Sequence, residues 1–221
     1  MTACHAPTPP PKHHHAFTLA LVGNPNAGKT TLFNALTGLR AKTANFPGTT
    51  VERKVGRMYL PKQIVVVDLP GLYSLDSKSP DEKLASDALQ GKLSHTAPDA
   101  ALVVVDATNL ERNLFLVSQI LELKVPVIVA LNMMDMAHRD GIRIDVDKLR
   151  AELGCAVVPV SARSGAGLDA LRKELNRLVA GAMPESVSHS QPNCGSCTGC
   201  TFQARYEWTE QISTRVMDSK L

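Results

Sequence analysis

The sequence has little that would place it among membrane-spanning or nucleic-acid-binding proteins. Its longest uncharged apolar run, residues 125–134, is far short of the ~20 residues that a membrane-spanning helix needs. Aromatic residues make up only 4% of the chain, and no run of Lys or Arg is interleaved with them, which argues against a nucleic-acid-binding surface. Residues 1–17 contain no apolar segment of a signal peptide, so we expect the chain to stay in the cytoplasm.

The composition is that of an ordinary folded protein. Hydrophobic residues account for 44% of the 221 residues and charged residues for 20%, which excludes disorder throughout. A formal net charge of +3 is too small and too scattered to indicate a polyanionic partner. We therefore expect one hydrophobic core, in a main domain at residues 16–182. A flexible arm at residues 1–15 precedes it, and a Cys-rich linker at residues 183–203 follows it.

Short apolar, β-rich runs alternate with amphipathic stretches, a pattern typical of βαβ units around a mostly parallel sheet. Uniformly apolar runs, as at residues 102–105, indicate central strands that are buried on both faces. Gly56 and the alternating run before Pro61 indicate a hairpin, so one antiparallel edge strand is expected. The prediction is an α/β fold with a mostly parallel, six-stranded sheet flanked by helices. The predicted strands are 18–22, 53–59, 63–67, 100–105, 125–131 and 156–160, and the predicted helices are 29–36, 82–93, 110–123, 146–153 and 168–180.

The motif G-x-x-x-x-G-K-T spans residues 23–30 and stands between a predicted strand and a predicted helix. Glycines in such a turn let backbone N–H groups converge on a polyphosphate, and the helix N-terminus adds partial positive charge. Lys29 would add a full charge at the terminal phosphates, and the Thr30 hydroxyl would bind Mg²⁺. The alternative is a purely structural glycine-rich turn, which would rarely fall between a strand and a helix by chance.

A second motif, D-x-x-G, begins at Asp68 at the end of a predicted strand. The Asp68 carboxylate would hold Mg²⁺ through a water, and the Gly71 amide would reach the γ-phosphate. The position strengthens the prediction, because ligands bind at the carboxyl edge of open α/β sheets. Residues 45–54, which contain Pro47 and Gly48, are predicted to be irregular, with a loop threonine that completes the Mg²⁺ shell.

Two further motifs follow later strands and would recognise the base. In N-x-x-D, the Asp135 carboxylate would accept hydrogen bonds from N1 and N2 of guanine, while Asn132 would brace the neighbouring loops. Adenine offers no such pair of donors, so guanine is favoured. Residues 161–163, of sequence SAR, follow the last strand, where the Ala162 N–H would meet guanine O6. The alternative for Asp135 is a helix cap or a solvated carboxylate, and Met133 is expected to pack, with one flank over the base.

Five elements in this order make residues 17–180 resemble the translation-factor-like branch of GTPases, and more narrowly the cytoplasmic G domain of the FeoB ferrous-iron transporters. The resemblance covers about three quarters of the chain. One departure is Met133, where many relatives have Lys. The segments that carry the resemblance are GNPNAGKTTLFNALTG at 23–38, NFPGTTVERKVG at 45–56, VVDLPGLYSLDSKSPDE at 66–82, DATNLERNL at 106–114, ALNMMD at 130–135 and VPVSARSGAGLDAL at 158–171.

The resemblance implies GTP and GDP as ligands, Mg²⁺ and K⁺ as cofactors, and two switch segments: switch I at residues 41–52 and switch II at residues 71–81. Thr50 becomes the switch I ligand of Mg²⁺, and Asn26 matches the asparagine that binds K⁺ in the family. Leu72 stands where many small GTPases carry a water-positioning Gln. A K⁺ ion beside the phosphates would replace the charge of an arginine finger, so we expect slow, potassium-stimulated hydrolysis.

The predicted site residues can be grouped by role. The predicted catalytic residues are Asn26, Lys29, Thr50 and Gly71; the predicted Mg²⁺ ligands are Thr30, Thr50 and Asp68; and the predicted K⁺ ligand is Asn26. The predicted nucleotide contacts are Gly23, Asn24, Pro25, Asn26, Ala27, Gly28, Lys29, Thr30, Thr31, Thr49, Thr50, Asp68, Gly71, Asn132, Met133, Asp135, Ser161, Ala162 and Arg163.

The end of the chain departs from the family. Family members have a bundle of helices between the G domain and the membrane region, and residues 183–221 are too few for it. Residues 204–221 resemble the last helix before the first membrane span, so the linker takes the place of the bundle. The resemblance implies a membrane transport domain of the same polypeptide as partner, absent from this chain, and a location at the cytoplasmic face of the inner (plasma) membrane. No nucleic acid is expected as a partner, and self-association into a homo-oligomer is left open.

Three of the five cysteines, Cys194, Cys197 and Cys200, have C-x-x-C-x-x-C spacing. In a cytosolic chain this spacing favours metal or redox chemistry over structural disulfides. Three thiolates could hold iron, zinc or part of a cluster, with His189 or Cys4 as a fourth ligand. The alternative is an unliganded, oxidisable loop.

Two competing functions stay open at this point. One is a soluble RNA- or ribosome-associated GTPase, which would need a basic domain downstream. The other is a metal-binding regulatory module in which nucleotide turnover is incidental. Cys155 lies in an apolar run and is expected to be a small core residue, and the histidines at 13–15 are interpreted as part of a solvated tail.

Overall fold

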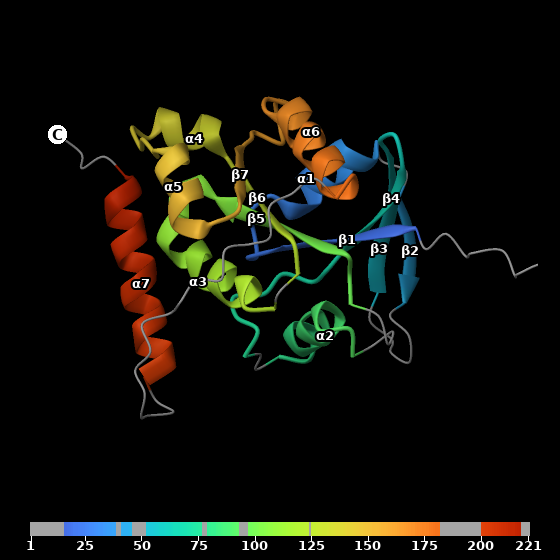
Figure 1. Cartoon of the computed structure of the whole chain (residues 1–221), viewed down its shortest axis with the longest axis horizontal. Helices are drawn as coiled ribbons and strands as arrows, with labels where there is room; N and C mark the ends of the chain where they lie inside the picture. Colours follow the sequence, from blue (N-terminus) through green and yellow to red (C-terminus); the bar gives the residue numbers. More distant parts are fainter. Residues whose placement is uncertain are drawn as a thin grey trace, which may run out of the picture.

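A computed structural model describes residues 16–38, 41–45, 52–76, 79–92, 97–123, 125–181 and 200–217. A central sheet lies between two layers of helices (Figure 1). One face of the sheet is covered by α1 and α6, and the other by α2, α3 and α5, with α7 packed against α3 and α5. The helices are α1 (Lys29–Thr37), α2 (Pro80–Leu89), the 3-10 helix η1 (Ala107–Asn109), α3 (Leu110–Leu121), α4 (Met134–Arg139), α5 (Val146–Leu153), α6 (Leu168–Val179) and α7 (Cys200–Val216).

The strands pair in the order β2-β3-β4-β1-β5-β6-β7. The pairs from β4 to β7 are parallel, while β3 runs antiparallel to both β2 and β4. The predicted α/β fold, with a mostly parallel sheet and an antiparallel strand at one side, is confirmed. The strands are β1 (Phe17–Gly23), β2 (Ala41–Asn45), β3 (Glu52–Tyr59), β4 (Gln63–Asp68), β5 (Ala100–Asp106), β6 (Val127–Asn132) and β7 (Ala156–Pro159).

The predicted number of six strands is wrong, because the described residues form seven. The additional strand is β2, which pairs with β3 and lies outside it at the edge of the sheet. It falls within the segment predicted as switch I. Its sequence, AKTAN, has no apolar alternation, and Ala41, Lys42, Thr43 and Asn45 are exposed. Backbone hydrogen bonds to β3 hold this strand, and hydrophobic periodicity cannot reveal them.

Helix α2 begins two residues before its predicted start. Pro80 occupies its first turn, and the Ser79 hydroxyl accepts a hydrogen bond from the Glu82 N–H at 3.2 Å. The Ser79 N–H in turn donates to the Glu82 carboxylate at 3.4 Å, which completes a capping box. Ser79, which lies before the predicted start of the helix, therefore forms the N-terminal cap of α2.

Hydrophobic clusters fill the space on both faces of the sheet. Alternate residues of β5 divide between them: Val103 and Val105 point into one cluster, and Leu102 and Val104 into the other. This alternation explains why the strand is apolar throughout. Both faces of the central strands are consequently closed to solvent, and a ligand can reach these strands only at an end.

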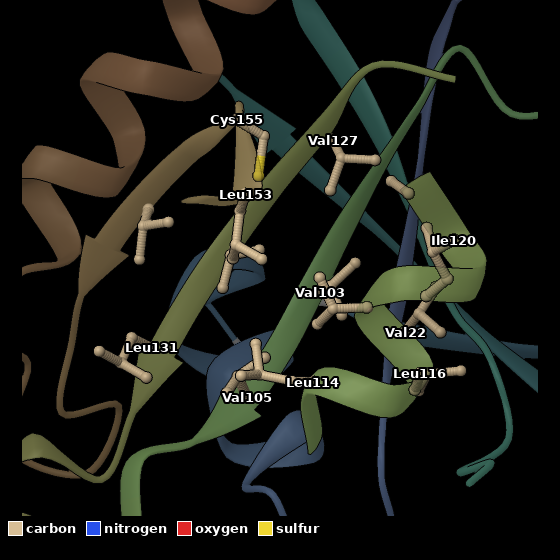
Figure 2. Packing of buried hydrophobic residues seen from close by; sticks show 14 of the residues in the cluster. Val22, Val103, Val105, Leu114, Leu116, Ile120, Val127, Leu131, Leu153 and Cys155 are labelled. Carbon is tan, nitrogen blue, oxygen red and sulfur yellow. The ribbon is translucent and has the colours of Figure 1, made fainter. Parts of the chain in front are cut away.

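Figure 2 shows the cluster beneath α3, where Leu114 and Ile120 of the helix lie near Val103 of β5. Cys155 belongs to the same cluster and is 9% exposed. Burial raises the pKa of its thiol to about 12, so the thiol is neutral at physiological pH. The prediction that Cys155 is a small core residue is confirmed.

Helix α7 lies along α3 and α5 (Figure 1). Ile212 and Val216 are each 1% exposed and join the cluster beneath α3. Arg215 forms an ion pair with Glu152 of α5 at 3.1 Å. The helix predicted at residues 204–221 thus starts earlier, at Cys200, and its helical part ends at Val216. None of the helices in the described part of the chain is both long and apolar enough to cross a membrane.

Candidate nucleotide site

The turn between β1 and α1 carries the glycine-rich motif. Asn26 and Gly28 have positive φ angles of 66° and 83°, so the backbone turns sharply between Gly23 and Lys29. A Cβ atom at Gly28 would lie 2.3 Å from Asn132 Nδ2, so only glycine fits there. In the described residues no side-chain hydrogen bond caps the N-terminus of α1. Its first N–H groups can therefore bind an anion.

Lys29 and Asp68 form an ion pair beside this turn. Lys29 Nζ lies 2.6 Å from Asp68 Oδ1, and the two side chains are 12% and 8% exposed. Lys29 is the first residue of α1 and Asp68 is the last of β4, so the pair joins the two motifs. An ammonium, a carboxylate and the nearby Thr30 hydroxyl are the donor set that a Mg²⁺-bound polyphosphate needs. The residues present fit that group.

The D-x-x-G turn packs directly on the glycine-rich turn. A Cβ atom at Gly71 would lie 3.2 Å from Pro25, and the Leu72 N–H donates to the Gly23 carbonyl at 3.3 Å. The Leu72 side chain is 0% exposed and belongs to the hydrophobic cluster. It therefore cannot orient a water molecule. Asn24 is buried at 3% exposure, and in the described part of the chain neither amide atom of its side chain has a hydrogen-bond partner.

Asn132, at the end of β6, connects the glycine-rich turn to the loop after β7. Its Nδ2 donates to the Ala27 carbonyl at 2.9 Å, and its Oδ1 accepts from the Ala162 N–H at 3.0 Å. The side chain is 3% exposed. Both loops are thus held against one buried amide. The Ala162 N–H, predicted to meet a base, is engaged within the protein instead.

Asp135 lies at the start of α4, and its carboxylate is exposed. Its backbone N–H donates to Ser161 Oγ at 3.1 Å, which ties α4 to the loop after β7. Hydrogen bonding from the Ser161 side chain lowers the pKa of Asp135 below its ordinary value. Because the carboxylate is ionised at neutral pH and open to solvent, it can accept hydrogen bonds from a ligand.

Met133 adopts a left-handed conformation, with φ of 62°, as the cap of α4. Its Cε lies 3.4 Å from the position of a Cβ at Gly28, so its side chain reaches the glycine-rich turn. A partly exposed apolar side chain therefore lies between the phosphate end and the base end of the site. The remaining predicted contacts are exposed in the case of Pro25, Asn26, Thr30, Thr31 and Arg163, and buried in the case of Gly23, Ala27 and Ser161.

Several predicted site residues lie outside the described part of the chain. These are the switch I threonines, Thr49 and Thr50, together with Cys194 and Cys197. Cys200 is the first residue of α7, and its side chain is also outside the description. Their roles stay predictions. Among the described residues, no group of three or more His, Cys, Asp or Glu is arranged to hold a metal ion.

Sequence reasoning missed two residues of α3 that contact the segment predicted as switch II. Gln119 accepts a hydrogen bond from the Leu75 N–H at 2.8 Å and donates one to Asp76 Oδ2 at 2.9 Å. The Arg112 guanidinium lies 4.3 Å from the centroid of the Tyr73 ring. Both residues sit inside a regular helix, where no motif marks them, so sequence gave no signal for these contacts.

A glycine-rich strand-to-helix turn, a carboxylate on the neighbouring strand and loops braced by an asparagine all meet at the carboxyl edge of the sheet. This arrangement defines the P-loop class of nucleotide-binding α/β domains, and specifically a GTPase fold. The family model described as ferrous iron transport protein B matches residues 17–175. The chain belongs to this family and corresponds to its N-terminal G domain.

Curated relatives agree with this assignment. The chain is 47% identical over 176 residues to the Fe(2+) transporter FeoB of Shigella flexneri, and equally to that of Escherichia coli (strain K12). The match covers 79% of this chain but only 23% of each relative. The chain thus spans about a quarter of the length of these transporters.

Solved structures resemble the chain over most of its length. The cytosolic domain of L. pneumophila FeoB has a TM-score of 0.76 and 36% identity, over 91% of this chain and 100% of that one. The cytosolic domain of the T. maritima FeoB iron transporter in its GMPPNP form has a TM-score of 0.80 and 28% identity, over 91% and 99%. Its GDP form I gives 0.81 and 28%, over 92% and 99%.

Proposed function

We propose that this chain binds GTP and GDP with Mg²⁺, hydrolyses GTP slowly, and acts as the switch domain of a ferrous iron transporter. The observation that carries the proposal is the Lys29–Asp68 pair beside an uncapped helix N-terminus. Solved relatives described as GDP-bound and GMPPNP-bound support a guanine nucleotide as the ligand. Membership of the ferrous iron transport family supports the wider role.

At the phosphate end, the N–H groups of the first turn of α1 would donate to phosphate oxygens, and Lys29 would turn from Asp68 toward the terminal phosphates. Thr30 and Asp68 would then hold Mg²⁺ together with Thr50 of switch I. When bound, Mg²⁺ supplies positive charge that stabilises the phosphate oxygens during transfer. The Gly71 N–H would donate to the γ-phosphate and so link switch II to the presence of that group.

At the base end, the exposed Asp135 carboxylate would accept hydrogen bonds from N1 and N2 of guanine. Adenine cannot supply this pair of donors, so ATP would leave the carboxylate unmatched. The Ala162 N–H already donates to Asn132, so we assign it no contact with the base. The apolar flank of Met133 would cover one side of the purine ring.

Hydrolysis would be slow because the residue after the D-x-x-G motif, Leu72, is buried and apolar. Asn26 is exposed in the glycine-rich turn and has a left-handed backbone, so its side-chain oxygen can bind a monovalent cation at the phosphates. Such a cation would add charge where a GTPase-activating arginine usually provides it. We therefore propose that K⁺ stimulates the reaction.

The transported ion, Fe²⁺, would pass through a membrane domain of the same polypeptide, outside the part of the transporter that this chain spans. The chain would then work at the cytoplasmic face of the plasma membrane. A nucleotide-dependent change at switch II would be the signal that the membrane domain senses.

Competition binding tests the nucleotide assignment. GTP, GDP and ATP would each displace a fluorescent guanine nucleotide in Mg²⁺ buffer that contains either K⁺ or Na⁺. We expect ATP to bind more weakly than GDP by at least about a hundredfold, because a site built for hydrogen bonds rejects a ligand that lacks them. Asp135→Ala should remove this preference, while Asp140→Ala, on an exposed residue of the same segment, should keep it. ATP binding as tightly as GTP to the unmodified chain would overturn the proposal.

A further inference from the structure

One face of helix α3 holds the backbone of switch II. Both polar atoms of the Gln119 side chain are bonded there, to the Leu75 N–H at 2.8 Å and to Asp76 Oδ2 at 2.9 Å. Gln119 is 5% exposed, so water cannot easily replace a lost partner. Arg112, two turns earlier in the helix, stacks over Tyr73. Switch II is thus fastened to α3 through its residues 73–76.

A neighbouring face of α3 holds α7. Arg205 donates to Ser118 Oγ at 3.1 Å and forms an ion pair with Glu122 at 3.0 Å. The rings of Phe115 and Tyr206 pack with their centroids 4.7 Å apart. The Arg205 side chain is 12% exposed, whereas its partner Glu122 is 45% exposed and Tyr206 is 54% exposed, so only the Arg205 side of these contacts is shielded from solvent.

The two sets of contacts occupy adjacent stripes of one helix. Arg112 and Gln119 are seven residues apart and share a stripe, and Phe115, Ser118 and Glu122 form the next at helical spacing. Gln119 directly follows Ser118, so the hydrogen bond that holds switch II and the one that holds α7 come from consecutive residues. A small shift or rotation of α3 must therefore change both sets of contacts together.

We propose that α3 couples the nucleotide bound at the site to the docking of α7, with Gln119 as the positioning residue on the switch II side and Arg205 on the α7 side. This inference rests on the proposed function, because it needs a GTP form and a GDP form. Switch II begins at Gly71, which packs on Pro25 of the glycine-rich turn. A change at the γ-phosphate therefore reaches Leu75 and Asp76 within five residues.

Coupling of this kind is reciprocal. If the GTP form changes how firmly α7 docks, then the docking of α7 changes the relative affinity for GTP and GDP by the same factor. Arg215 and Glu152, which tie α7 to α5 rather than to α3, should take no part in it. The pair provides a matched control, since its loss weakens docking equally in both nucleotide forms.

The chain carries its own reporter for the test. Trp208 is the only tryptophan of the sequence, lies in α7 and packs, partly buried, against the cluster beneath α3. We would bind GDP or a non-hydrolysable GTP analogue, each with Mg²⁺, to the full 221-residue chain. Trp208 emission and hydrogen exchange in α7 should then differ between the two forms. We expect a difference in exchange of at least about fivefold, the lower end of usual allosteric couplings.

Gln119→Met keeps the volume of the side chain but removes both hydrogen bonds to switch II. It should bind both nucleotides and fold, yet lose the difference at Trp208 and in exchange. Glu152→Gln should keep the difference. Arg205→Ala should change the ratio of the affinities for the GTP analogue and GDP, and Arg215→Ala should leave this ratio as it is.

The outcomes separate the two proposals. If neither nucleotide binds, the proposed function fails and the coupling falls with it. If both bind to the unmodified chain but α7 responds identically, the coupling is wrong while the proposed function stands. Survival of the full difference in Gln119→Met, or an unchanged affinity ratio in Arg205→Ala, would also refute the coupling.

Discussion

At the scale of single residues, several positions of the site can be occupied by only one or a few residue types. A side chain at Gly28 would collide with the amide of Asn132, and one at Gly23 would come within 2.6 Å of the Val104 carbonyl. Asn26 holds a left-handed backbone that asparagine tolerates better than most residues. The turn is therefore fixed before any ligand arrives, which lowers the entropy that binding must remove.

Asn26→Ala tests the proposed potassium site. The variant loses the side-chain oxygen, and alanine tolerates the left-handed backbone of this position less well than asparagine, so GTP should bind more weakly but still bind at saturating concentration. We expect the rate in KCl to fall by about tenfold, equivalent to about 1.4 kcal/mol, and the advantage of KCl over NaCl to disappear. Phosphate release measured in both salts checks this.

The matched control is Asn176→Ala, on α6 and away from the turn. It should hydrolyse GTP like the unmodified chain in either salt. An unchanged ratio of KCl to NaCl rates in Asn26→Ala would rule out this residue as the potassium ligand.

At the scale of elements, Asn132 of β6 holds together two loops that follow different strands. Asn132→Ala would leave the Ala27 carbonyl and the Ala162 N–H unpaired. Each buried group left without a partner costs about 1–3 kcal/mol, so we expect a loss of several kcal/mol in the free energy of unfolding and weaker GDP binding. Urea unfolding and calorimetric titration would measure both.

Asn132→Asp separates the loss of one hydrogen bond from the burial of a charge. It keeps an acceptor for Ala162 but places a buried carboxylate oxygen against the Ala27 carbonyl, so it should be at least as destabilised as Asn132→Ala at neutral pH. If Asn132→Ala were as stable as the unmodified chain, the asparagine would not be the brace that its distances indicate.

The long helices and strands were predictable because the hydrophobic residues of each recur with a clear periodicity. The α6 helix shows this best: Leu168, Leu171, Leu175 and Leu178 recur at helical spacing, and all four are buried. Strand β2 and the six-residue helix α4 were not predicted, because the first has exposed, mostly small or polar side chains and the second is too short to show a period. Their stability comes from neighbours that are distant in sequence.

The site shows the same division. Spacing along the chain singled out Gly28, Lys29, Asp68 and Asp135, because motifs encode the chemistry that a ligand needs, and their roles toward a ligand stay predictions. It could not predict that Lys29 pairs with Asp68 or that the Ala162 N–H is donated to Asn132, since these contacts depend on how strand ends meet. The contacts between α3 and switch II could not be predicted from the sequence for the same reason.

At the scale of the whole molecule, α7 completes the hydrophobic core although it follows the main domain in sequence. Deletion of residues 200–221 would expose the surface that Ile212 and Val216 cover. Each such side chain contributes about 1.5–3 kcal/mol when fully buried, so the free energy of unfolding should fall by about 3–6 kcal/mol. Circular dichroism during urea unfolding measures this, and binding of an apolar dye should rise.

Deletion of residues 218–221 alone is the control, and it should leave stability unchanged, because the buried residues of α7 precede it. Full stability after the larger deletion would mean that α7 does not dock in solution. In that case the contacts from α3 to Arg205 and Tyr206 could carry no signal.

The contact between Lys29 and Asp68 bears on how the molecule behaves in a cell rich in ions. While the two charges neutralise each other, the pair has little net field with which to attract free magnesium or free phosphate separately. If the proposed function holds, a metal already joined to its triphosphate would offer Lys29 and Asp68 new counter-charges at the same time. Occupancy of the site would then depend on the concentration of the metal–triphosphate complex and little on the separate concentrations of free metal and free triphosphate.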